Sequence, residues 1–141
     1  LQAQLRAIGM NIKIEPMERA SWFDLAFAKG QFDITFYAHA ISVVDADFCT
    51  YPFLHSSEAD GKGNNYMGIK DPVLDSFLEK ARYSLDEEKR NEYYLKVCEI
   101  IRDDSLFVPC YTGKRTMAAV KNLKGVYADP MMRYYTYNYS W

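Results

Sequence analysis

The chain has 141 residues, of which 49% are hydrophobic and 26% charged, and its formal net charge is -2. This length and composition are ordinary for a globular domain that buries one hydrophobic core. The near-neutral charge argues against the basic face that nucleic-acid binding requires. No apolar run approaches the roughly 18 residues of a membrane span.

The chain opens on a helical pattern, because Leu1, Leu5 and Ile8 recur on one helix face and Gly9 follows as a stop. Residues 11–15 then alternate polar and apolar side chains, which predicts a strand. The chain has no initial Met and its first helix has no N-cap, so we expect it to be part of a longer protein.

The next segments predict a helix followed by a second strand. Residues 20–29 place aromatic side chains on one helix face, and Gly30 is the expected end of that helix. Residues 32–37 alternate again. The order strand, helix, strand predicts a βαβ unit with parallel strands and a right-handed crossover.

Loops dominate the middle of the chain. We expect a loop over residues 38–46, a short helix over 47–54 with Asp47 as N-cap, and a polar surface loop over 55–70.

Two longer helices and two strands follow. Asp71 and Pro72 are typical of a helix start, and Ser84 with Glu87 predicts a capping box for a helix that ends near Asp103. The residues expected to be buried on these helices are Leu74, Phe77, Leu78, Ala81, Tyr94, Val97 and Ile101. Strands are predicted near 106–111 and 115–120, so the expected fold class is α/β, a mixed sheet flanked by helices.

Four stretches together resemble family 5 of the bacterial extracellular solute-binding proteins, the peptide and nickel binders. The stretches are "LQAQLRAIGMNIKIE" at 1–15, "GQFDITF" at 30–36, Asp45-Ala46-Asp47-Phe48, and "NNYMGIKDPVLDSFLEKAR" with "DEEKRNEYYLKVCEIIRDDSLFVPCY" over 64–111. The third is similar to the family's Asp-Pro-Asp motif with Ala in place of Pro. Their order and spacing match the family over essentially the whole chain.

The resemblance implies both an architecture and a function. Residues 1–124 would form part of the C-terminal lobe of a type II periplasmic-binding-protein-like fold, and 125–141 a tail that returns to the N-terminal lobe. The protein would be the extracytoplasmic substrate-binding component of an ABC importer, either periplasmic or a cell-surface lipoprotein. It would bind peptides or another small solute between two lobes and deliver them to the permease membrane subunits. The alternatives are the ligand-sensing domain of a transcription regulator and a nickel or metal-chelate binder of the same family.

The loop after the second predicted strand is the candidate ligand site, because ligands bind at the carboxyl ends of strands in open α/β sheets. The same loop lines the peptide cleft in the family, which implies ligand contacts from Ala38, His39, Ala40, Ile41, Ser42 and Asp45. Ser42 stands where dipeptide binders carry the carboxylate that pairs with the ligand's amine, and His39 stands where they carry Trp. These departures argue against specificity for free dipeptides.

Other chemistry has weaker support in the sequence. Asp45 and Asp47 resemble an acid–base pair, but at a helix start they are more typical of capping and turn residues. His39, Asp45, Asp47, Cys49 and His55 match no standard metal-ligand spacing. We therefore expect no enzyme, no catalytic residue, no metal and no cofactor.

The cysteines and the tyrosine-rich tail could form contacts within the chain or between copies of it. Cys49, Cys98 and Cys110 form no CxxC pair and are expected to be small buried residues, with a disulfide between two of them left open. The tail after residue 125 is dense in tyrosine, and aromatic rings of this kind usually bury a large area. We expect a chain lacking the rest of the protein to self-associate through this tail.

Overall fold

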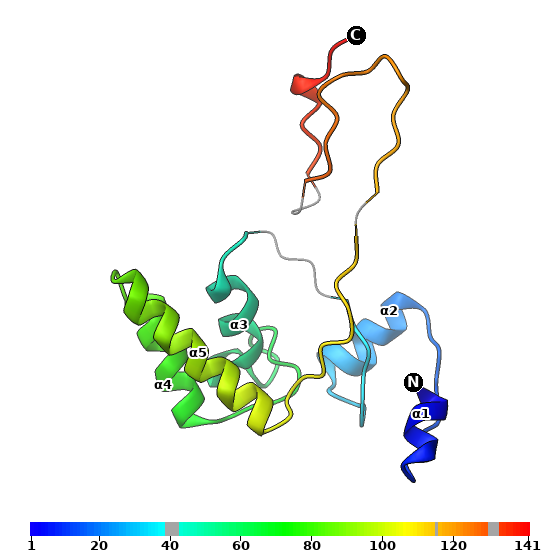
Figure 1. Ribbon diagram of the computed structural model, residues 1–141. Coiled ribbons are helices and arrows are strands. Elements are labelled where there is room, and N and C mark those ends of the chain that lie inside the picture. The colour runs from blue at the N-terminus through cyan, green and yellow to red at the C-terminus, as the bar shows by residue number, and fades with distance from the viewer. Residues whose placement is uncertain (39–42, 115, 130–132) are drawn as a thin grey trace. The chain divides into compact units, whose positions relative to one another are not determined.

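The computed structural model describes residues 1–38, 43–114, 116–129 and 133–141. The chain divides into two units, Leu1–Thr35 and Phe36–Trp141. The regular structure of the described residues is almost entirely helical, and the chain after α5 is largely irregular (Figure 1).

The first unit contains three short helical segments. Helix α1 spans Gln2–Ala7, and the chain leaves it through Gly9, whose φ of 88° is in the left-handed region that glycine adopts without strain. Helix α2, Arg19–Trp22, continues directly into the π-helical turn η1, Phe23–Ala28. The helix predicted over 20–29 is therefore confirmed, with its second half wound more widely than an α-helix.

Aromatic contacts hold α2 and η1 together. The ring centroid of Trp22 lies 5.0 Å from that of Phe23 and 6.3 Å from that of Phe27. The Trp22 indole N–H also donates a hydrogen bond of 2.6 Å to Oγ1 of Thr35. Ala26 is the buried residue among the described residues of this unit.

The core of the second unit lies among three helices. These are α3 (Ala46–Leu54), α4 (Pro72–Tyr83) and α5 (Glu87–Asp103), and α4 packs against both of the others. The 3₁₀ turn η2, Ser56–Glu58, follows α3. The fully buried core side chains come from all three helices: Leu54, Leu74, Leu78 and Val97. The predicted buried face of α4 is thereby largely confirmed, although Phe77 is only half-buried.

Both long helices begin at an aspartate N-cap. The carboxylate of Asp71 accepts the backbone N–H groups of Val73 and Leu74, and Pro72 occupies the first turn, as predicted. The capping box predicted at Ser84 is wrong. The N-cap of α5 is Asp86, which accepts from the backbone N–H of Lys89, and the Ser84 hydroxyl donates to the Asp86 carbonyl.

The last residues fold back on themselves. Lys124 and Ser140 form an isolated antiparallel bridge with N–O distances of 2.8 and 3.3 Å. The 3₁₀ turn η3, Thr136–Asn138, lies just before this bridge. The rings of Tyr127 and Tyr135 stack with a centroid separation of 5.7 Å.

The expected α/β fold with a mixed sheet is wrong for the residues that the structure describes. Residues 11–15, 32–37, 106–111 and 116–120 are not strands, and Lys124–Ser140 is the only bridge found in the described ranges. Alternating side chains show which residues could face a core, but a strand forms only where a neighbouring strand pairs with its backbone. No such neighbour occurs within the described ranges, and apolar side chains of the predicted strands such as Ile14 and Ile34 are 60% and 67% exposed.

Candidate functional site

The predicted ligand residues fall partly outside the described structure. Ala38 is exposed at the end of one described range, and Asp45 lies just before α3. His39, Ala40, Ile41 and Ser42 lie outside the described residues. The described part of the candidate site is therefore the end of the loop, where Asp45 leads into α3.

Asp45 is the N-cap of α3. Its backbone is extended, with φ of -146° and ψ of 139°, and its Oδ1 accepts the backbone N–H of Asp47 at 2.8 Å. The same oxygen accepts a second bond of 2.7 Å from Nη2 of Arg90 on α5. The prediction that Asp47 caps this helix is wrong by two residues, because the carboxylate that reaches the free backbone N–H belongs to Asp45.

Asp47 forms a second ion pair, with Arg82 near the end of α4. Three hydrogen bonds of 2.8 to 3.1 Å join Nε and Nη2 of Arg82 to the two carboxylate oxygens, which is the two-pronged geometry that a guanidinium favours. The Arg82 guanidinium also lies over the Tyr51 ring, 3.3 Å from its centroid. The first turn of α3 is thus fixed to both long helices.

These contacts keep the four charges in place. The hydrogen bond from Arg90, and then that from the Asp47 backbone, lower the pKa of Asp45 below its usual value. The hydrogen bonds that Arg90 and Arg82 donate to these carboxylates raise the pKa values of both arginines. At neutral pH Asp45 therefore stays ionised and holds no proton for acid catalysis.

His55 continues this cluster on the other side of Tyr51. The two rings stack with centroids 4.2 Å apart. The backbone N–H of Ser57 donates to Nδ1 of His55 at 3.1 Å, and the Ser57 hydroxyl lies 2.8 Å from the same nitrogen. Nε2 is buried and has no hydrogen-bond partner among the described residues, while Oε1 of Glu79 lies 3.5 Å and Oδ1 of Asp75 3.9 Å away.

Asn65 fixes the loop that follows His55. Its side chain is 2% exposed, and its Nδ2 donates to the backbone carbonyls of His55 and Ile69 at 3.1 and 2.8 Å. Its Oδ1 accepts the Ile69 N–H at 3.0 Å. The segment expected to be a surface loop therefore contains a buried amide that satisfies three backbone groups.

Metal and thiol chemistry find little support near this cluster. Across the described ranges, no group of three or more His, Cys, Asp or Glu side chains is arranged to hold a metal ion. Cys49 on α3 is half-buried, and burial, followed by the charge of Asp45, raises the pKa of its thiol.

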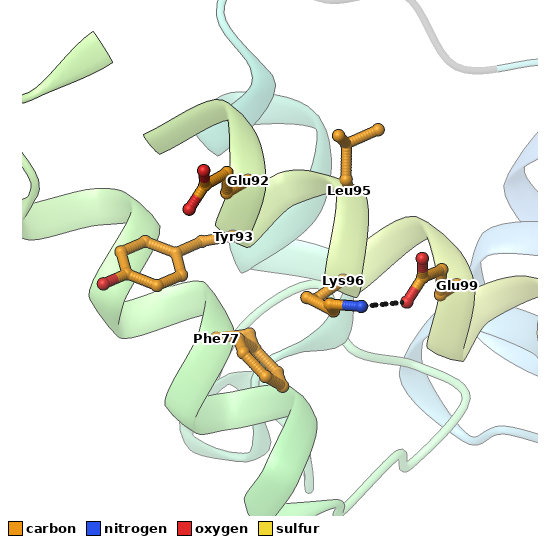
Figure 2. A pocket seen from close by; sticks show the side chains of 6 residues that line it. All are labelled: Phe77, Glu92, Tyr93, Leu95, Lys96 and Glu99. Carbon is orange, nitrogen blue, oxygen red and sulfur yellow. Dashed lines mark hydrogen bonds and ion pairs between the residues drawn. The ribbon is translucent and has the colours of Figure 1, made fainter. Parts of the chain in front are cut away.

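A groove of about 310 Å³ lies along α4 and α5 and is lined by neither Ala38 nor Asp45. Figure 2 shows its lining, in which the Phe77 and Tyr93 side chains lie near an ion pair of 2.8 Å between Lys96 and Glu99. The groove is open, and it contains none of the residues predicted to bind the ligand.

Arg82 and Arg90 belong to the site but were not predicted from the sequence. Both lie in quoted stretches, Arg82 at the end of "FLEKAR" and Arg90 at the end of "DEEKR". No local signal pointed to them, because acidic residues at a helix start are already stabilised by the helix dipole, and the arginines lie 35 and 45 positions further along the chain.

No helix in the described part of the chain has the length and apolar character needed to cross a membrane. No family model matches the chain, and no solved structure matches it. Two curated proteins do. The chain is 28% identical to the probable D,D-dipeptide-binding periplasmic protein DdpA of Escherichia coli over 93% of its length, and 24% identical to the oligopeptide-binding protein AppA of Bacillus subtilis over 100%.

The chain spans about a quarter of the length of each of these relatives. The extracytoplasmic location expected from the resemblance agrees with the E. coli relative, which is a periplasmic protein. The resemblance itself is confirmed: this chain is similar, over nearly all of its residues, to the extracellular solute-binding proteins of family 5.

Proposed function

We propose that the chain is part of the substrate-binding component of an ABC importer, and that the whole protein binds peptides in a cleft between two lobes. The observation that carries the proposal is the similarity over 93% and 100% of this chain to proteins named for binding a D,D-dipeptide and oligopeptides. Both names describe binding rather than catalysis, which favours a non-enzymatic role. The partners would be a peptide and the permease subunits; self-association through the tail remains a prediction.

Within this proposal, the ligand is contacted by Ala38, His39, Ala40, Ile41, Ser42 and Asp45. Support comes from the two ion pairs that fix the end of the loop, Asp45 with Arg90 and Asp47 with Arg82. A loop that contacts a ligand with useful affinity must lose little conformational freedom on binding, so a fixed end lowers the free-energy cost of binding.

The test is retention of peptides by the full-length gene product. Purified protein is mixed with a random tripeptide library, and the retained peptides are identified by mass spectrometry and titrated singly by calorimetry. Retention of peptides by the folded protein, and not by protein unfolded in urea, is the expected result. If the folded protein retains no peptide but does retain a nickel chelate, the metal-chelate alternative replaces the proposal.

A pair of matched variants tests the loop. A Trp side chain at position 38 would project from the proposed ligand loop, so Ala38→Trp should weaken peptide binding by about tenfold or more. Ala118 is also exposed and lies outside the loop, so Ala118→Trp should change the affinity by less than about twofold. Equal effects of the two variants would contradict the placement of the site.

A further inference from the structure

His55 is a buried residue whose polar atoms have no part in the proposed function. It follows α3 directly and is 7% exposed. Its Nε2 is buried without a hydrogen-bond partner among the described residues, and the nearest carboxylate oxygens belong to Glu79 and Asp75 on α4, at 3.5 and 3.9 Å. A buried polar atom costs free energy until a partner comes within hydrogen-bond distance.

The other ring nitrogen holds the turn η2. Nδ1 accepts the backbone N–H of Ser57 at 3.1 Å and lies 2.8 Å from the Ser57 hydroxyl. The backbone N–H of Ser56 donates to Oδ1 of Asp75 at 2.9 Å, which ties the same turn to α4. The imidazole therefore lies between η2 and α4, with one ring nitrogen near each.

A neutral imidazole carries one proton, and neither position of that proton satisfies all of these groups. With the proton on Nε2, Nδ1 accepts from the Ser57 backbone, but Nε2 has no acceptor at hydrogen-bond distance. With the proton on Nδ1, the ring donates to the Ser57 hydroxyl, and the Ser57 backbone N–H loses its acceptor. A doubly protonated ring can donate from both nitrogens, to the Ser57 hydroxyl and to the carboxylate of Glu79.

The charged surroundings of the ring leave the carboxylates of α4 available to a second proton. The charged side chains on the elements that contact His55 are Asp47, Glu58, Asp75, Glu79, Lys80 and Arg82. Of the two cations, Lys80 lies over the Phe77 ring and Arg82 is paired with Asp47. The loop after η2 meets His55 through the uncharged amide of Asn65.

We propose that His55 is a proton-controlled latch between η2 and α4. In acid, the doubly protonated ring donates from Nε2 to Glu79, and Nδ1 releases the backbone N–H of Ser57. At higher pH the ring loses one proton, the ion pair with Glu79 is lost, and Nδ1 again accepts the Ser57 N–H. Histidine side chains change charge between about pH 5 and 8, and a protein outside the cytoplasm meets the pH of its surroundings.

The test is amide hydrogen exchange at Ser57, measured by mass spectrometry in the full-length gene product from about pH 5 to 8. Each observed rate is divided by the rate of an unprotected amide at the same pH, which removes the ordinary pH dependence of exchange. Ser57 is exposed, so its amide exchanges readily once Nδ1 no longer accepts from it. We expect protection to be about fivefold lower at the acidic end of the range, the effect of losing one hydrogen bond.

Three variants assign this change to the latch. His55→Gln removes the titrating ring and should keep Ser57 protection constant within about twofold over the whole range. Glu79→Gln removes the partner of Nε2 at a side chain that is 56% exposed, so the fold is kept and the midpoint of the profile should move to lower pH by about half a unit. Glu92→Gln makes the same change at an exposed position on α5 and should leave the midpoint in place.

The inference is overturned if Ser57 protection is the same at both ends of the pH range, or if the profile persists in His55→Gln. A midpoint that is equal in Glu79→Gln and the unaltered protein would remove Glu79 as the partner and contradict the latch. A shift of the same size in Glu92→Gln would make it a general effect of charge. If His55→Gln does not fold, Glu79→Gln still decides, and the result does not depend on whether the protein binds peptides.

Discussion

Replacement of Asp45 by Ala should separate the two contributions that this residue makes at the start of α3. The first is the helix cap, whose loss costs about 1 kcal/mol. The second is the ion pair with Arg90, in which the two side chains are 29% and 33% exposed. Solvent screening limits such a pair to roughly 0.2–1 kcal/mol. The sum predicts that Asp45→Ala lowers the free energy of unfolding by about 1–2 kcal/mol.

Asp45→Asn provides the matched comparison, because Asn caps a helix about as well as Asp but carries no charge. It should cost only the ion-pair contribution, so less than about 1 kcal/mol. The assay is urea unfolding followed by helical circular dichroism, with Asp103→Asn as a control in an exposed ion pair where no measurable change is expected.

The pH dependence of the free energy of unfolding tests the ion-pair contribution separately from the helix cap. The folded-state pKa of Asp45 lies below its unfolded value, so the ion pair contributes stability above the unfolded value near pH 4, and this stability is lost as pH falls through the folded pKa. The difference between the unaltered chain and Asp45→Asn should therefore be full at pH 7 and smaller at pH 3. Equal losses for the Ala and Asn variants would refute the capping contribution, and a difference independent of pH would refute the ion-pair contribution.

Three further predictions concern other parts of the chain. Asn65→Ala should lower the free energy of unfolding by about 2–3 kcal/mol in urea unfolding, because it leaves buried backbone groups without partners; a loss below about 0.5 kcal/mol would contradict this. Gly125→Ala should open the bridge at the base of the tail, since φ is 78° and the new Cβ would lie 2.0 Å from the Asn138 carbonyl oxygen; unchanged amide exchange at the bridge, measured by NMR, would argue against it. Cys49 should react with a maleimide at pH 7 more slowly than the two exposed cysteines and accelerate as pH rises, because burial raises the pKa of its thiol; mass spectrometry of each labelled site checks this.

The helices could be predicted because their signals are local. Asp71 and Pro72 specify the start of α4 within three residues of chain, and the predicted end of α5 at Asp103 is confirmed. Capping was less predictable where two candidates stand close together. Asp45 and Asp47 are both good caps by type, and the choice between them depends on where Arg90 and Arg82 lie after the helices have packed.

The strand predictions failed because a strand needs a neighbouring strand to pair with, and the local pattern of side chains does not show whether one is present. Ile34 and Phe36 alternate with polar residues as an edge of a sheet would, yet both are exposed. The contacts of the candidate ligand loop were also not predictable from the local sequence. Its proposed role came from the family resemblance, while the residues that hold its end lie 35 and 45 positions further along the chain.

The placement of the core has a consequence for how the chain opens. The buried hydrophobic side chains other than Ala26 lie between Leu54 and Val97, so the cooperative free energy is concentrated in the three packed helices. Residues 1–35 bury too little to share in that cooperativity. Their amides should exchange with solvent through local fluctuations, while those of α4 and α5 exchange only when the helical core opens as one unit.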